Sequence, residues 1–426
     1  MHRERSAGGR RRSVRGLLRS IGPELVSAAS DNDPTNVGTA AAVGAQAGYQ
    51  LCWVAVLVAP LLGVVLTIAA QVGAVARDDL QSLTLKRYGR GVAAVLLVSV
   101  VVVNLVTIAA DLQAGAAGIG LLAGIGSRWL VVPLGAAVAG LLLAGKYGQV
   151  VAVLRYLMLG FLAFGAAAVL AHPDWPRLLE ARVVPALSLR PEELAGGLAL
   201  LGTTLTSYVC VWETIGRGVE EPPDPAAGDG GLARARTGAV AGAVAGAVFT
   251  AVILWFLLVA SAATLGRHHL TAGSAQDAAR ALRPLAGPLA GDLFAAGLII
   301  SAVVALPVLL ATTAHVVGAQ FGWRRGLSEQ IGRARGFYAV LAASIGLALA
   351  VTLAGVSVIG MLVAASVIGG LGTPIGLVLL VRLARDPQIM GPRPISRRLS
   401  IAGWAVAAIV SGFGLLAIIG AALGTF

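Results

Sequence analysis

The chain has 426 residues, of which 57% are hydrophobic and only 12% are charged. Together with a mean hydropathy of +0.86, this composition excludes an ordinary soluble domain and indicates a polytopic membrane protein. The net charge of +12 does not indicate nucleic-acid binding, because the basic residues fall between apolar segments and build no basic folded face. Cys52 and Cys210 lie in or beside apolar segments, so no disulfide framework is expected.

Eleven apolar segments are predicted to be membrane-spanning helices, which makes the fold all-α. Most approach or exceed the ~20 residues that a helix needs to cross the hydrocarbon core. Residues 1–20 are rich in arginine and are expected to form a basic, disordered cytoplasmic arm ahead of one transmembrane domain over residues 21–426. The predicted spans are 22–46, 50–76, 92–122, 127–145, 148–171, 197–218, 237–264, 286–318, 337–355, 358–382 and 401–424.

The loops between these spans carry an uneven charge. One set of alternate loops, with the N-terminal arm, holds 25 of the 32 Lys and Arg residues, and the other set holds 7. Because basic loops stay on the cytoplasmic side, this bias predicts a plasma-membrane protein with a cytoplasmic N-terminus and an external C-terminus. Residues near Arg15 and Arg333 are expected inside, and residues near Arg182 and His268 outside.

The first span contains the polar stretch Ser-Asp-Asn-Asp-Pro-Thr-Asn at residues 30–36. Each carboxylate in a membrane span costs about 2.5–3.5 kcal/mol on insertion scales. Pro34 lacks a backbone donor and disfavours helix at Asp33, so a broken helix with free carbonyls beside Asp33 and Asn36 is expected. Broken helices hold the ion in many transporters. The alternative is that Asp33 only caps a half-helix.

The sixth span contains a second candidate break. Gly202 lowers helix propensity, and the hydroxyls of Thr203, Thr204, Thr206 and Ser207 compete for backbone hydrogen bonds. The absence of a proline makes this inference weaker than the one for the first span. Interrupted helices at matching positions of two halves nevertheless indicate a transport site near the midplane. The oxygen ligands of both breaks suit hard cations such as Mg²⁺ or Mn²⁺.

Other polar residues within the spans could serve either transport or packing. Asn104, Thr107 and Asp111 share one face of the third span. Asp111 and Asn104, with Glu213 at the end of the sixth span, are candidates for an ion or proton path. The alternative for the third-span residues is polar packing against a neighbouring helix. His315 stands alone in the eighth span and is expected to be a packing residue.

The motifs of the first span resemble the natural resistance-associated macrophage protein (NRAMP) family of divalent-metal transporters. The resemblance rests on Gly22-Pro23, Asp33-Pro34-Thr35-Asn36 and residues 44–49, with support from residues 77–80 and 109–112. It implies the leucine-transporter fold, with inverted five-helix repeats over about 21–171 and 197–382, discontinuous helices 1 and 6, and an extra helix over 401–424. It also implies that Asp33 and Asn36 coordinate the metal, with carbonyls from the first break and from Thr203. The family has glycine where this chain has Thr35.

The sixth span departs from the family pattern. Thr206, Ser207 and Tyr208 align with the family's Met-Pro-His, so the soft methionine ligand is missing. The nearby family glutamate falls at Ala114, and the ninth span contains no arginine. This pattern resembles the divergent, NRAMP-related magnesium-transporter branch. Cys210, one turn beyond Thr206, is either a replacement soft ligand or a small buried residue.

These observations predict a divalent cation transporter for Mn²⁺ and/or Mg²⁺ that works by alternating access, with Asp33, Asn36, Thr203 and Thr206 as metal ligands. The cation is the substrate and no cofactor is expected. The alternative is a sodium-coupled transporter of a small organic solute on the same fold, which the negative charge of Asp33 disfavours for anions. No enzyme motif is evident. Proton coupling, the oligomeric state and the roles of Cys210 and Glu213 stay open.

Overall fold

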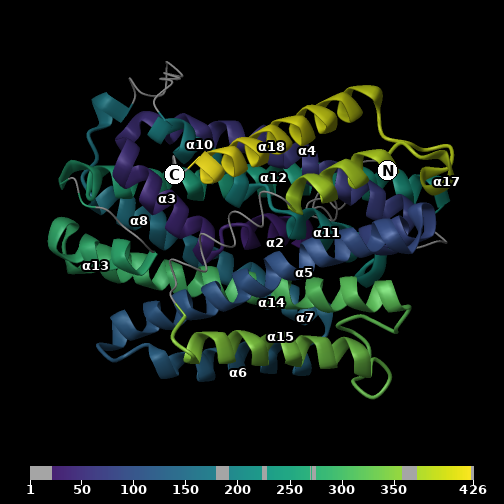
Figure 1. The fold of residues 1–426 in the computed structure, drawn as a ribbon, viewed down its shortest axis with the longest axis horizontal. Coiled ribbons are helices and arrows are strands. Elements are labelled where there is room, and N and C mark those ends of the chain that lie inside the picture. Colours follow the sequence, from purple (N-terminus) through teal and green to yellow (C-terminus); the bar gives the residue numbers. More distant parts are fainter. Residues whose placement is uncertain are drawn as a thin grey trace, which may run out of the picture.

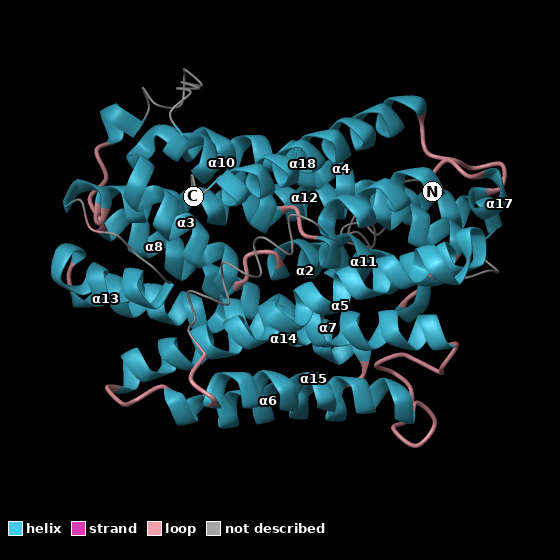
Figure 2. Ribbon diagram, viewed as in Figure 1, coloured by secondary structure: helices cyan, strands magenta, loops and turns pink. Residues whose placement is uncertain are grey.

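The structure, a computed structural model, describes residues 22–178, 191–222, 228–268, 270, 275–356 and 372–423. All regular structure in these ranges is helical, and most helices run along one direction of the molecule (Figures 1 and 2). The all-α prediction is therefore confirmed. The helices are α2 (Gly22–Ser30), α3 (Pro34–Ala47), α4 (Cys52–Ala76), α5 (Leu80–Ala123), α6 (Val131–Ala144), α7 (Tyr147–Leu157), α8 (Leu162–Leu170), α10 (Pro191–Thr204), α11 (Ser207–Ile215), α12 (Gly228–Ala263), α13 (Ala275–Ala286), α14 (Pro288–Phe321), α15 (Arg335–Leu353), Gly372–Leu383, α17 (Pro387–Met390) and α18 (Arg397–Leu423).

The described helices agree with the predicted plan of spans. Eight stretches are long and apolar enough to cross a membrane, and one of them, Pro34–Ala76, covers parts of two predicted spans. Arg128–Ala144 and Gly372–Leu383 are shorter apolar helices at the fourth and tenth predicted spans. The arm over residues 1–20 and the first part of the tenth span lie outside the described residues.

A short helical segment precedes the third predicted span, which starts at residue 92. The segment begins at Leu80, where Asp79 caps it by accepting a hydrogen bond from the Ser82 amide at 2.9 Å. Gly89, at φ 81° and ψ 179°, then kinks this helix, and glycine adopts such a conformation without steric cost. Between the predicted seventh and eighth spans, the connection over residues 265–285 contains most of the alanine-rich helix α13.

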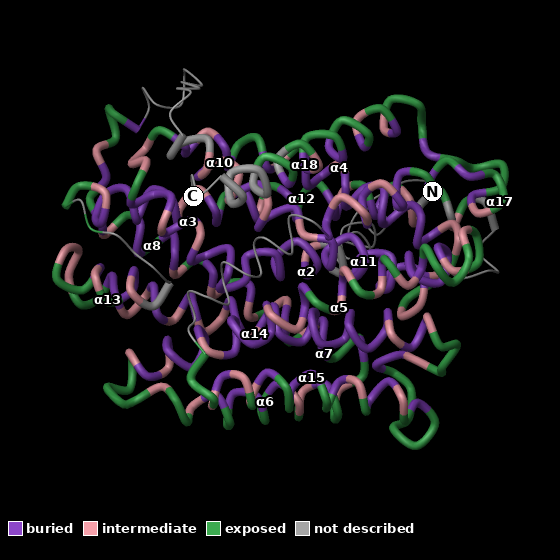
Figure 3. The backbone as a smooth tube through the Cα atoms, in the orientation of Figure 1, coloured by how far each residue is buried: buried purple, intermediate pink, exposed green. Residues whose placement is uncertain are grey.

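The outer faces of the bundle are apolar. Among the large hydrophobic residues of α5, Val98 is 59% exposed, and on α18 Leu415 is 60% exposed. Figure 3 shows such exposed positions along the outermost helices, while the helices in the middle are mainly buried. Apolar surface of this extent is not stable in water, and it matches a lipid-facing surface on a multi-pass membrane protein.

Two helix pairs dominate the packing: α5 lies against α14, and α4 lies against α12. The broken pair α2 and α3 also packs on α12, and α3 contacts α10. In Figure 1, α2 and α11 lie near the middle of the bundle, α13 lies at one end and α17 at the other. The two interrupted helices therefore meet about halfway along the bundle.

Close packing of α3 on α12 depends on Gly44. A Cβ atom at this position would lie 2.7 Å from the Leu258 carbonyl oxygen and 2.9 Å from the Ser261 Cβ. We expect Gly44→Ala to lower stability by about 1–3 kcal/mol, as overpacking does, which thermal unfolding in detergent will measure. Gly140→Ala is the matched control, because nothing lies within 4 Å of a Cβ there. Equal melting temperatures for the two variants would contradict this packing account.

Candidate metal centre

The first break separates α2 from α3. Pro34 occupies the first turn of α3, where its missing N–H is not needed. Asp33 is the N-cap residue, with extended backbone, and its Oδ1 accepts a hydrogen bond from the Asn36 amide at 2.7 Å. The capping role that was the alternative for Asp33 is therefore real, but it occupies only one of the two carboxylate oxygens.

The second break separates α10 from α11 without a proline. Thr206 has extended backbone, with φ −77° and ψ 147°. The hydroxyls of Thr203 and Thr204 donate back to carbonyls of their own helix, at 2.9 Å to Ala199 and 2.6 Å to Leu200. The predicted interruption of the sixth span is thus present.

The two breaks face each other across the bundle. The hydroxyl oxygens of Thr203 and Thr204 lie 3.2 and 3.3 Å from Asn36 Oδ1. The Thr206 hydroxyl donates to Asp31 Oδ1 at 3.1 Å. The structure therefore brings Asn36, Thr203 and Thr206 to one place, from segments about 170 residues apart in sequence.

Asp33 also reaches the second break, through Tyr208. The Tyr208 hydroxyl lies 2.8 Å from the Ser30 carbonyl oxygen and 3.3 Å from Asp33 Oδ2. Sequence reasoning had noted Tyr208 only as a departure from the family pattern. Its hydroxyl now connects α11 to both sides of the first break.

Counting hydrogens shows which oxygens are available to a cation. Each hydroxyl has a single proton, and Thr203 and Thr204 each have a helix carbonyl closer than Asn36 Oδ1. Tyr208 likewise lies closer to a carbonyl than to Asp33 Oδ2. The hydroxyls near Asn36 Oδ1 and Asp33 Oδ2 therefore donate preferentially to other oxygens. These two oxygens lack a dedicated hydrogen-bond donor, although Asn36 and Asp33 are 0% and 2% exposed.

Asp31 and Asn32 complete the polar lining of the first break. Both are fully buried, and Asp31 Oδ2 and both side-chain polar atoms of Asn32 have no hydrogen-bond partner. The sequence analysis did not assign them to the site, because the family motif that gave the ligands begins at Asp33.

The donor set is built mainly of oxygen. Within the described part of the chain, no three His, Cys, Asp or Glu side chains form a group that would hold a metal ion. Amide, hydroxyl and carbonyl oxygens must therefore complete any cation shell that Asp33 begins. Such ligands suit hard divalent cations.

The candidate path residues fall in different places. Asp111 is fully buried beside the first break, where its Oδ1 accepts from the Thr35 hydroxyl at 3.1 Å and its Oδ2 has no partner. Asn104 instead donates to Thr313 on α14 at 3.0 Å, which is the polar-packing alternative. Glu213 accepts a 2.6 Å hydrogen bond from Ser27 on α2, so it lies beside α2 and away from the break.

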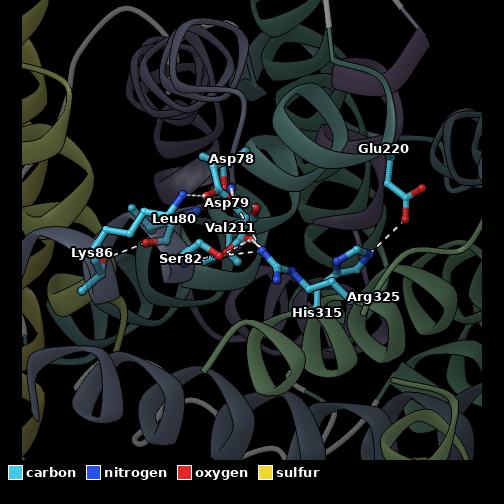
Figure 4. Close-up of polar contacts among 11 residues, drawn as sticks. Asp78, Asp79, Leu80, Ser82, Lys86, Val211, Glu220, His315 and Arg325 are labelled. Carbon is cyan, nitrogen blue, oxygen red and sulfur yellow. Dashed lines mark hydrogen bonds and ion pairs between the residues drawn. The ribbon is translucent and has the colours of Figure 1, made fainter. Parts of the chain in front are cut away.

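A cluster of polar side chains lies at the end of the bundle where α4 joins α5 (Figure 4). Arg325 donates to Asp79 at 2.6 Å and lies 3.3 Å from Asp78. His315 is fully buried and lies 3.0 Å from Glu220 in η4 (Gly216–Glu220). The expectation that His315 only packs is therefore incomplete, since it also pairs with a carboxylate 95 residues away.

An ion pair fixes α17 at the same end. Arg87, near the start of α5, binds the Asp386 carboxylate, which also caps α17 by accepting from the Gln388 amide at 2.8 Å. The hydrogen bond from Arg87 holds the pKa of Asp386 below its ordinary value. Arg87 is 38% exposed, so the pair is partly screened by solvent.

Comparisons with known proteins agree on one family. The chain is 27% identical over 409 residues to the divalent metal cation transporter MntH of Deinococcus radiodurans, covering 94% of this chain and 89% of that protein. Its fold matches the Eremococcus coleocola manganese transporter, with a TM-score of 0.78 and 18% identity, over 98% of this chain and 89% of the other. It also matches Mhp1, a nucleobase-cation-symport-1 family transporter, with a TM-score of 0.58 and 15% identity, over 92% and 90% of the two chains.

These structural matches confirm the predicted fold, which this chain shares with both transporters. The family model described as natural resistance-associated macrophage protein-like matches residues 24–420. That range contains both helix breaks and nearly all of the described helices. The chain therefore belongs to the NRAMP-like family.

Proposed function

We propose that this protein transports a divalent metal cation, Mn²⁺ together with Mg²⁺, across the plasma membrane by alternating access. The observation that carries the proposal is that two broken helices meet at two buried oxygens, Asp33 Oδ2 and Asn36 Oδ1. The hydroxyls beside these oxygens have closer acceptors elsewhere. A related protein, MntH, is a divalent metal cation transporter. The position of the breaks near the middle of the bundle fits a site reached alternately from each side.

The proposed ligands are Asp33, Asn36, the Thr203 main-chain carbonyl and Thr206. Asp33 supplies fixed negative charge, and the other three supply neutral oxygens. Retained water completes the shell, which favours Mg²⁺ because this ion gives up its water reluctantly. The methionine thioether that would favour softer metals has no counterpart at Thr206.

Asp111 is proposed to bind the ion or a proton next along the transport path. It lies beside the first break through Thr35, and its second oxygen has no partner. Glu213, which lies away from the break beside α2, is proposed as a more distant residue of the ion or proton path. We assign no transport role to Asn104, because its amide is engaged with α14.

The organic-solute alternative fits this site poorly. Asp31 and Asp33 together present two buried carboxylates, and like charges repel an anionic substrate. The similarity to Mhp1 supports the fold only, and it does not assign a substrate to this chain.

The test is metal uptake by the purified protein in proteoliposomes that contain a metal indicator and a pH-sensitive dye. We expect Mn²⁺ influx above empty liposomes, and inhibition of that influx by external Mg²⁺. The dye reports whether protons move with the metal. Uptake of an amino acid or nucleobase driven by a sodium gradient, without any Mn²⁺ influx, would overturn the proposal in favour of the alternative.

The proposed orientation has its own test. Arg333 and His268 are both exposed and lie on connections assigned to opposite sides of the membrane. In intact cells, an impermeant maleimide should label His268→Cys but label Arg333→Cys only after permeabilisation. Cys52 and Cys210 are buried, so the background is low. Labelling of Arg333→Cys in intact cells would reverse the topology.

A further inference from the structure

Asp31 is a buried carboxylate that the ligand set above leaves unused. It is fully buried, its Oδ1 accepts a hydrogen bond from Thr206 at 3.1 Å, and its Oδ2 has no partner. Buried carboxylates in proteins are normally paired or coordinate a metal. Asp31 therefore needs a partner that the protein alone does not supply to Oδ2.

The Asp31 side chain connects the first break to the second. Its hydrogen-bond partner, Thr206, belongs to the opposite break. Asp33 reaches the same break, since its Oδ2 lies 3.3 Å from the Tyr208 hydroxyl on α11. Asp31 and Asp33 thus approach the same space from one irregular segment of backbone.

Two neighbouring buried carboxylates of like charge destabilise each other in a low-dielectric interior. A cation placed between them removes both the unpaired charge and the repulsion. A divalent cation balances the two charges fully, whereas a monovalent cation leaves one negative charge buried. The number of charged ligands is a main determinant of how strongly a protein binds a divalent cation.

We propose that Asp31 is a second anionic ligand of the transport site, and that with Asp33 it selects doubly charged over singly charged cations. This inference rests on the proposed function. The Thr206 hydroxyl donates its proton to Asp31 Oδ1 and keeps its lone pairs for the cation. Thr206 therefore acts as a ligand and also positions the Asp31 carboxylate, with Oδ2 as the coordinating atom.

The test is Asp31→Asn, which keeps the size of the side chain and an oxygen for Thr206 but removes the charge. In proteoliposomes we expect the KM for Mn²⁺ to rise about tenfold, equivalent to ~1.4 kcal/mol, and Na⁺ to compete more strongly than in the wild type. Asp31→Glu keeps the charge and should recover part of this loss. Asp292→Asn, which removes a surface carboxylate paired with Arg283, should keep the wild-type KM.

Thermal unfolding separates ligand binding from a structural role. Without metal, Asp31→Asn should melt no lower than the wild type, because it removes a buried repulsion. The stabilisation produced by added Mn²⁺ should shrink, since that stabilisation follows the dissociation constant. A structural role would instead lower the melting temperature with and without metal, and would overturn the proposal.

The outcomes distinguish this inference from the proposed function. Wild-type transport with an unchanged KM and unchanged Mn²⁺ stabilisation in Asp31→Asn overturns the role of Asp31 and leaves the transporter proposal intact. A wild-type protein that neither binds nor moves Mn²⁺ overturns both. If Asp31→Asn does not fold, Asp31→Ser, which still offers Thr206 an oxygen, is judged by the same two measurements.

Discussion

We expect Mn²⁺ uptake to fall to the level of empty liposomes when Asp33 is replaced by Asn. The substitution removes the charge and one carboxylate oxygen from the first break, while the remaining oxygen still accepts from the Asn36 amide that Asp33 caps at 2.7 Å. The cap and the broken helix should therefore survive, and only the cation loses its anionic ligand. We expect at least a ~100-fold loss of transport, which corresponds to ~2.8 kcal/mol or more.

The control for Asp33→Asn is Asp292→Asn. Asp292 carries the same charge, but it lies half-exposed at the surface in an ion pair with Arg283 at 2.5 Å. This variant should transport Mn²⁺ at the wild-type rate, and both variants should elute as monodisperse protein. Wild-type flux in purified Asp33→Asn would remove Asp33 from the site.

The second large effect is a change of metal preference in Thr206→Met. Methionine places a polarisable sulfur where the site has a hydroxyl, and sulfur ligands favour softer metals. Relative to Mg²⁺, we expect the preference for Mn²⁺ or Cd²⁺ to rise about tenfold, a differential binding of ~1.4 kcal/mol. The measurement is Mn²⁺ uptake with and without millimolar Mg²⁺, in the wild type and in the variant.

Thr206→Val is the matched control for this change. Valine also removes the hydroxyl that donates to Asp31, but it adds no sulfur, so a shift seen only in Thr206→Met is due to the thioether. Wild-type uptake that ignores Mg²⁺ while Cd²⁺ competes strongly would show that a soft ligand is already present. Cys210, buried one turn along α11 with its thiol 3.0 Å from the Ser207 carbonyl oxygen, would then be the residue to replace.

The sequence was sufficient to predict features with a strong local cause. Pro34 has no backbone donor, and Asp33 before it favours extended backbone, so the first break follows from two adjacent residues. The second break needed a comparison between the two halves of the chain, because Thr206 carries no such local signal. The apolar spans followed from length and hydropathy alone.

Features that depend on tertiary contacts could not be read from the sequence. The pairing of His315 with Glu220 joins residues 95 positions apart, and nothing local to either residue specifies it. Asp31 lies outside the family motif that gave the ligands, and its contact with Thr206, 175 residues away, is visible only in the folded structure. The capped segment from Leu80 to the kink at Gly89 was not assigned, because it is polar and lies ahead of the apolar span.

The cation is proposed to bind where the two broken helices meet. The most direct measurement is the anomalous scattering of Mn²⁺ in crystals of the purified protein, recorded at the manganese absorption edge. We expect one strong peak between Asp33 and Asn36, in contact with the Thr203 to Thr206 segment. This peak should be absent in Asp33→Asn. A peak elsewhere in the molecule, or none there at saturating Mn²⁺, would contradict the proposed site.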